Sequence, residues 1–154
     1  MKPRIHFAKV APGAFDAMDP LETYLGASPV EQKLLHLIRL RASQVNGCAY
    51  CLDMHWKDLK ALGDTDQRLY GLDAWRESPY YTDKERAALA WTEAVTLIAD
   101  GQGPDDVFAE LERQFNEREV ADITMTIATI NAWNRISISA RLMPGTYKST
   151  LGTK

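Results

Sequence analysis

The chain of 154 residues lacks the marks of several specialised protein classes. No apolar run approaches the roughly 18 residues of a membrane-spanning helix, and the first ten residues are too polar for a signal peptide. Lysine and arginine (18) are fewer than aspartate and glutamate (21), so the net charge is -3 and no basic surface for nucleic acid is indicated. We therefore expect a cytoplasmic protein without nucleic-acid or membrane partners.

Cysteine and histidine are scarce, with two and three residues respectively. Both cysteines, Cys48 and Cys51, lie in the stretch from Asn46 to His55, which also contains one of the three histidines. In a cytoplasmic protein, two cysteines separated by two residues are more often catalytic or metal-binding than a structural disulfide. This stretch is therefore the first candidate for a functional site.

Composition and local patterns predict a single all-α domain over residues 1–154. Apolar content of 45% and charged content of 25% are those of an ordinary globular protein, and no linker, repeat or low-complexity tract interrupts them. A capping box with proline at the first helical position occurs at residues 28–31, and similar boxes occur at 82–85 and 116–119. Residues 64–67 form a weaker version of the same signal.

We expect residues 1–10 to be extended and about six or seven helices to follow. The main predicted helices cover about residues 30–46, 49–62, 67–75, 84–99, 107–115 and 119–142. The last of these is rich in Ile and Thr, which favour strands, but its cap, alanines and length favour a helix. It is apolar around much of its circumference, so it is either the central helix of a monomer or part of a subunit interface.

The spacing of Cys48, Cys51 and His55 predicts a thiol redox site. In a helix these three residues share one face, and both cysteines fall in the first turn, where free N–H groups favour a thiolate. One thiolate would attack a peroxide to form a sulfenic acid, and the second thiol would condense with it to a disulfide. The helix dipole favours Cys48 as the attacking residue and proximity to His55 favours Cys51; we assign attack to Cys51 and resolution to Cys48.

Three other interpretations of the same residues stay open. The cysteines could be two buried structural residues. They could join His55 in a metal site, although a structural zinc site needs a fourth ligand, which His6 or His36 would have to supply. His55 could also be an ordinary surface histidine.

The stretch from Leu37 to His55, with its Asn-Gly-Cys-Ala-Tyr-Cys core, closely resembles the alkyl hydroperoxidase D-like branch of the carboxymuconolactone decarboxylase family. The resemblance extends through residues 80–96 and 131–135. It implies an all-α fold, a homo-trimer or homo-hexamer, and reduction of small hydroperoxides without bound metal or flavin. It also implies a thioredoxin-like or lipoyl-bearing reductant. Cys51 matches the sulfenic-acid cysteine of the family, Cys48 its partner, and His55 its proton-relay histidine.

Two positions depart from the family pattern. His36 stands where the hydroperoxidase has a relay glutamate, twelve residues before the first cysteine, and Tyr50 replaces a histidine before the second cysteine. A neutral His36 could accept a hydrogen bond but could not stabilise a charged His55 as a carboxylate does. Glu93 is therefore a candidate replacement for the relay glutamate, with a solvated or capping carboxylate as the alternative.

Other functions within the same fold are a redox-sensing or stress-response oligomer with slow turnover and a non-redox lyase of the decarboxylase type. The cysteine pair argues against the lyase, which does not need it. Three arginines, Arg39, Arg41 and Arg135, could bind an anionic substrate, although structural arginines are more common.

Overall fold

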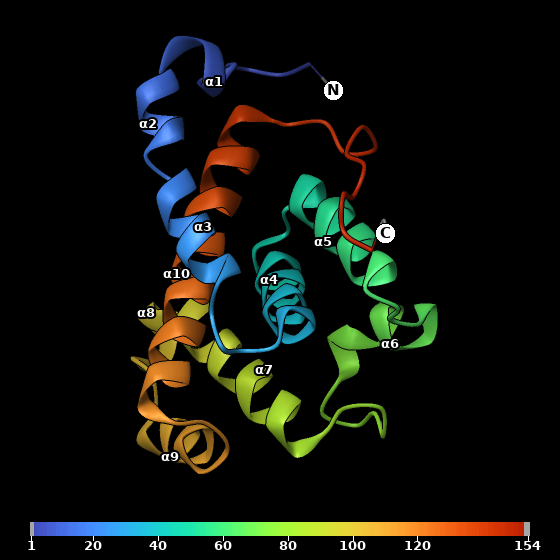
Figure 1. Ribbon diagram of the computed structural model, residues 1–154, viewed down its shortest axis with the longest axis vertical. Coiled ribbons are helices and arrows are strands. Elements are labelled where there is room, and N and C mark those ends of the chain that lie inside the picture. The colour runs from blue at the N-terminus through green and yellow to red at the C-terminus, as the bar shows by residue number, and fades with distance from the viewer. Residues whose placement is uncertain (1, 153–154) are drawn as a thin grey trace.

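The computed structural model describes residues 2–152, and every regular element in that range is a helix (Figure 1). The all-α prediction is confirmed. The six longer helices are α3 (Asp19–Gly26), α4 (Gln32–Asn46), α5 (Ala49–Ala61), α7 (Asp83–Thr96), α9 (Asp105–Gln114) and α10 (Glu117–Ala140). The short elements are α1 (Phe7–Val10), α2 (Pro12–Asp16), α6 (Asp66–Tyr70), the 3₁₀ helix η1 (Leu72–Ala74) and α8 (Ile98–Gly101).

Helix α4 lies at the centre of the molecule and packs against α5, α7 and α10 (Figure 1). The core between these helices consists of aliphatic side chains, each worth about 1.5–3 kcal/mol when fully buried. Its fully buried members include Leu35, Ile38, Leu59, Leu89, Ile123 and Ile127. Because α4 and α5 carry the predicted site, this core fixes the positions of the functional side chains relative to one another.

Helix α10 is buried largely within one chain. It packs against α3, α4, α5, α7 and α9, and these contacts cover much of its apolar circumference. Met125 and Ile138 on the same helix are partly exposed. No helix within residues 2–152 combines the length and the apolarity that crossing a bilayer would need.

Of the four predicted helix starts, two are confirmed, one is shifted by a residue because Thr65 rather than Asp64 caps α6, and one is wrong. Thr82 with Glu85, and Asn116 with Glu119, form complete capping boxes at α7 and α10. Ser28 caps no helix, and α4 begins only at Gln32. The Ser28 hydroxyl donates instead to Asp122 of α10 (2.7 Å), so it is committed to a contact between elements distant in the sequence.

The N-terminal segment is more helical than predicted. Residues 7–10 form the single turn α1 rather than an extended segment, and the sequence patterns did not indicate α2 and α3. Proline occupies the first turn of both α2 and α3, where its missing N–H costs nothing. Figure 1 shows these helices stacked beside α10, and α3 packs directly on it, which brings Phe15 and Glu22 to the site.

Candidate functional site

A tight turn between α4 and α5 positions the two cysteines. Gly47 ends α4 in the left-handed conformation (φ 69°), and Cys48 N donates back to Ser43 O. The Asn46 side chain donates to the amide oxygens of Asn131 (2.9 Å) and Asn134 (2.8 Å) on α10. The turn is therefore held against α10, and the start of α5 has a fixed direction.

Cys48 and Cys51 are joined by a disulfide at the start of α5. Cys48 is the N-cap residue, and its sulfur accepts a hydrogen bond from the backbone N of Cys51 (3.4 Å). The predicted placement in the first helical turn is confirmed, and the Cα atoms lie 5.4 Å apart. Both residues are only 1% exposed, so a reactant would have to reach them through a cavity rather than at the open surface.

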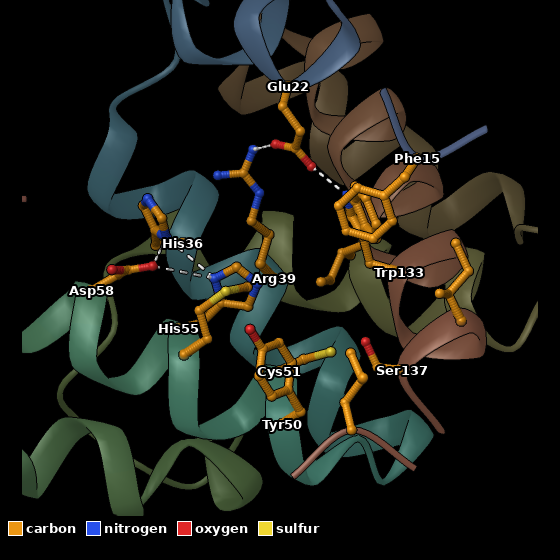
Figure 2. Close-up of a pocket in the computed structure, with 14 residues that line it drawn as sticks. Phe15, Glu22, His36, Arg39, Tyr50, Cys51, His55, Asp58, Trp133 and Ser137 are labelled. Atoms are coloured by element: carbon orange, nitrogen blue, oxygen red, sulfur yellow. Dashed lines mark hydrogen bonds and ion pairs between the residues drawn. The ribbon is translucent and has the colours of Figure 1, made fainter. Parts of the chain in front are cut away.

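Such a cavity, of about 330 Å³, lies beside α5 (Figure 2). Cys51 lines it and Cys48 does not. Most of its other walls are apolar or aromatic: Phe15, Tyr50, Met54, Ile130, Trp133, Ile136 and Leu142. The cavity therefore offers Cys51 a largely apolar binding space.

Three buried polar side chains form one wall of this cavity. The Nδ1 atoms of His36 and His55 are 3.4 Å apart and share a hydrogen bond. Oδ2 of Asp58 lies 3.6 Å from Nδ1 of His36 and 3.8 Å from Nδ1 of His55. The structure thus brings His36 to His55, and it adds a carboxylate, Asp58, that the sequence analysis did not select.

Burial keeps both imidazoles neutral. It is the main cause that lowers the pKa of His36 to about 4, and the nearby Arg39 guanidinium lowers it further, while Asp58 opposes the shift. The pKa of His55 is held well below its usual value by burial, then by His36 and Arg39. Nε2 of His55 is buried and has no hydrogen-bond partner among residues 2–152. His55 is therefore a neutral imidazole whose Nε2 makes no hydrogen bond within this range.

The C-terminal segment holds Asp58 in place. After α10 the chain returns across α5 (Figure 1), and the Tyr147 hydroxyl donates to Oδ1 of Asp58 (2.8 Å). Lys57 donates to the backbone oxygen of Tyr147 (3.0 Å), and Gly145 N donates to the carboxylate of Asp53 (2.9 Å). Burial and the hydrogen bond to Asp58 raise the pKa of Tyr147 to about 12, so its hydroxyl stays protonated.

A second polar group joins α3, α4 and α10 across the cavity. Arg39 donates to Oε2 of Glu22 (3.1 Å), and the Trp133 indole donates to Oε1 of the same carboxylate (2.8 Å). Figure 2 shows Glu22 between these two partners, with Phe15 against the Trp133 ring. The arrangement offsets the buried charge of Arg39 and orients one aromatic wall.

Comparison with known proteins identifies the family of this chain. The family model described as "Carboxymuconolactone decarboxylase family" matches residues 12–94, which include both cysteines, His36, His55 and Asp58. The chain belongs to this family. The uncharacterised protein YdfG of Bacillus subtilis is 38% identical over 139 residues, covering 90% of this chain and 95% of that protein.

Solved structures place the chain in the alkyl hydroperoxidase D-like branch of the carboxymuconolactone decarboxylase family. A protein of unknown function from Agrobacterium tumefaciens, suggested to be the antioxidant defence protein AhpD, is 45% identical with a TM-score of 0.92. The match covers 95% of this chain and 100% of the Agrobacterium chain. The debrominase Bmp8 shares the fold, with 23% identity and a TM-score of 0.76 over 88% of this chain and 73% of its own.

Three other candidates from the sequence analysis, Glu93, Arg41 and Arg135, do not line the cavity, whereas Arg39 does. Glu93 accepts hydrogen bonds from Arg41 (2.8 Å), Trp75 (2.8 Å) and Arg76 (2.5 Å) and does not line the cavity. These bonds lower its pKa despite the opposing effect of burial. Arg135 donates to Asn131. The carboxylate beside His55 is therefore Asp58, three residues further along α5, rather than Glu93.

Proposed function

We propose that this protein is a thiol-dependent peroxidase that reduces hydroperoxides through Cys51 and Cys48. The observation that carries the proposal is that Cys51 and His55 line the same cavity while Cys48 is close enough to form a disulfide with Cys51. Membership of the alkyl hydroperoxidase D-like branch supports it. We assign attack to Cys51 because Cys48 does not face the cavity.

The proposed catalytic cycle has three steps. The Cys51 thiolate attacks the terminal oxygen of ROOH, the O–O bond breaks, and Cys51 becomes a sulfenic acid while RO⁻ leaves and takes a proton. The Cys48 sulfur then attacks the Cys51 sulfur, a disulfide forms and water leaves. An external dithiol supplies two electrons and two protons by thiol–disulfide exchange and restores both thiols.

The residues around Cys51 suit the first step. Cys51 lies in the first turn of α5, where the helix dipole favours a thiolate, while the N–H hydrogen bond at this helix start is accepted by the Cys48 sulfur. Neutral His55, one helical turn later, can accept the thiol proton and return it to the departing alkoxide. His36 and Asp58 contact Nδ1 of His55 and so orient the ring.

The cavity favours an organic hydroperoxide over hydrogen peroxide. Its walls include Phe15, Tyr50 and Trp133, and an aromatic or alkyl R group would bury apolar surface against them. A structure of Bmp8 holds 2,3,4-tribromopyrrole, a planar aromatic compound, in the same fold. A thioredoxin-like or lipoyl-bearing dithiol as reductant, and a homo-trimer or homo-hexamer as the assembly, belong to this proposal.

Stopped-flow fluorescence of the pre-reduced protein tests it, with cumene hydroperoxide and hydrogen peroxide as substrates. His6→Gln is the control, because His6 is exposed and distant in the sequence from Cys51. Wild type and His6→Gln should be oxidised at the same rate. Cumene hydroperoxide should oxidise both proteins faster than hydrogen peroxide does. Cys51→Ser should abolish the reaction, and His55→Gln should slow it by about 10²–10⁴-fold. Equal rates in wild type and Cys51→Ser would reject the peroxidase. Disulfide formation without catalytic turnover would indicate the redox sensor instead.

A further inference from the structure

The triad of His36, His55 and Asp58 has the geometry of a metal-binding site. The three facing atoms, Nδ1, Nδ1 and Oδ2, are separated by 3.4, 3.6 and 3.8 Å. Ligand atoms about 2.1 Å from a tetrahedral zinc ion lie about 3.4 Å from one another. The equidistant point in the plane of the three atoms lies about 2.1 Å from each, the length of a zinc–nitrogen or zinc–oxygen bond, so an ion would sit close to that plane.

The donor set selects the class of ion. Two imidazole nitrogens and one carboxylate oxygen suit first-row divalent ions such as Zn²⁺, Fe²⁺ or Co²⁺, while Mg²⁺ and Ca²⁺ prefer oxygen ligands. Three protein ligands with an open position are typical of sites that also bind water or a small molecule. The open position here would face the cavity, because all three residues line it.

A second observation is the buried carboxylate itself. Asp58 is 3% exposed, and among residues 2–152 its ion-pair partners are only the two imidazoles. A buried carboxylate is costly unless a cation or hydrogen bonds compensate it. Oδ1 of Asp58 accepts a hydrogen bond from the Tyr147 hydroxyl, and hydrogen bonds of this kind orient carboxylates that bind metal ions.

We infer that His36, His55 and Asp58 bind a first-row divalent metal ion of the zinc class, with an open coordination position toward the cavity. Arg39 also lines the cavity, and its ion pair with Glu22 (3.1 Å) offsets part of its charge at the site. The inference concerns binding and does not depend on the peroxidase activity. The zinc site weighed in the sequence analysis used the cysteines; this one does not.

Isothermal titration with Zn²⁺, and visible absorption with Co²⁺, test the inference on the oxidised protein. The disulfide removes both thiolates as ligands, so only nitrogen and oxygen donors are present. Wild type and His6→Gln should bind one ion per chain, and Co²⁺ should show ligand-field bands without a thiolate charge-transfer band. His36→Gln and Asp58→Asn should each lose at least about 10–100-fold in affinity.

Tyr147→Phe keeps all three ligands and removes only the hydrogen bond to Asp58, so it covers the case in which a ligand variant fails to fold. It should weaken Zn²⁺ binding by about 10-fold or more while one ion per chain still binds at saturation. The inference is overturned if wild type binds no Zn²⁺, or if binding is unchanged in His36→Gln, Asp58→Asn and Tyr147→Phe.

Discussion

The buried, neutral state of His36 predicts a specific loss of stability in acid. In the unfolded chain His36 has its ordinary pKa of 6.5, and in the folded protein its pKa is about 4. Between these values the unfolded state binds the extra proton, so the free energy of unfolding falls as the pH falls from about 6.5 to about 4. Above about pH 6.5 the contribution is fully present, because His36 is neutral in both states.

The magnitude follows from the difference between the two pKa values. The lowering from 6.5 to about 4 corresponds to about 3 kcal/mol in total, most of which is lost by about pH 4.5. His36→Gln removes this titrating group. Between about pH 7 and about pH 4.5, its free energy of unfolding should therefore fall by about 2–3 kcal/mol less than that of wild type.

Urea unfolding at both pH values, with the disulfide intact and EDTA present so that no metal ion occupies the site, measures this difference. His6→Gln is the matched control, since His6 is exposed, and it should lose as much stability in acid as wild type. If His36→Gln loses as much stability as wild type, His36 is not held neutral by its surroundings, and the electrostatic account of the site fails.

Three further predictions concern the turn, the C-terminal segment and the metal. Gly47→Ala should lower the free energy of unfolding by about 1–2 kcal/mol, because alanine is strained in the left-handed conformation. The added Cβ would contact no other atom, so no steric clash contributes, and an unchanged stability would contradict the prediction. Tyr147→Phe should cost about 1–3 kcal/mol in urea unfolding, because Asp58 loses a buried partner; a neutral result would mean that water replaces the hydroxyl. Zn²⁺ should slow the proposed peroxidase, since it occupies His55, and EDTA should restore the rate; insensitivity to Zn²⁺ would separate the metal site from catalysis.

Local patterns predicted the parts of the site that lie within one helical turn. The placement of Cys48 and Cys51 in the first turn of α5 follows from their spacing and from Gly47, all within a few residues. The capping boxes at Thr82 and Asn116 were predictable for the same reason, because each needs only residues three apart.

Contacts between distant segments could not be predicted. The Ser28 hydroxyl bonds Asp122, and Glu22 joins Arg39 to Trp133, so each depends on how α3 packs against α10. Asp58 could have been selected from the sequence, because it lies three residues after His55. Its importance shows only when His36 is folded against it.

Sulfenic-acid trapping tests the central claim that Cys51, facing the cavity, is the residue that peroxide oxidises. The pre-reduced Cys48→Ser protein, which cannot form the internal disulfide, is treated with one equivalent of cumene hydroperoxide in the presence of dimedone and analysed by peptide mass spectrometry. The account predicts a single dimedone adduct on Cys51 and a much slower adduct in the Cys48→Ser, His55→Gln double variant. An unlabelled Cys51 in the Cys48→Ser protein, together with a labelled Cys48 in Cys51→Ser, would contradict it.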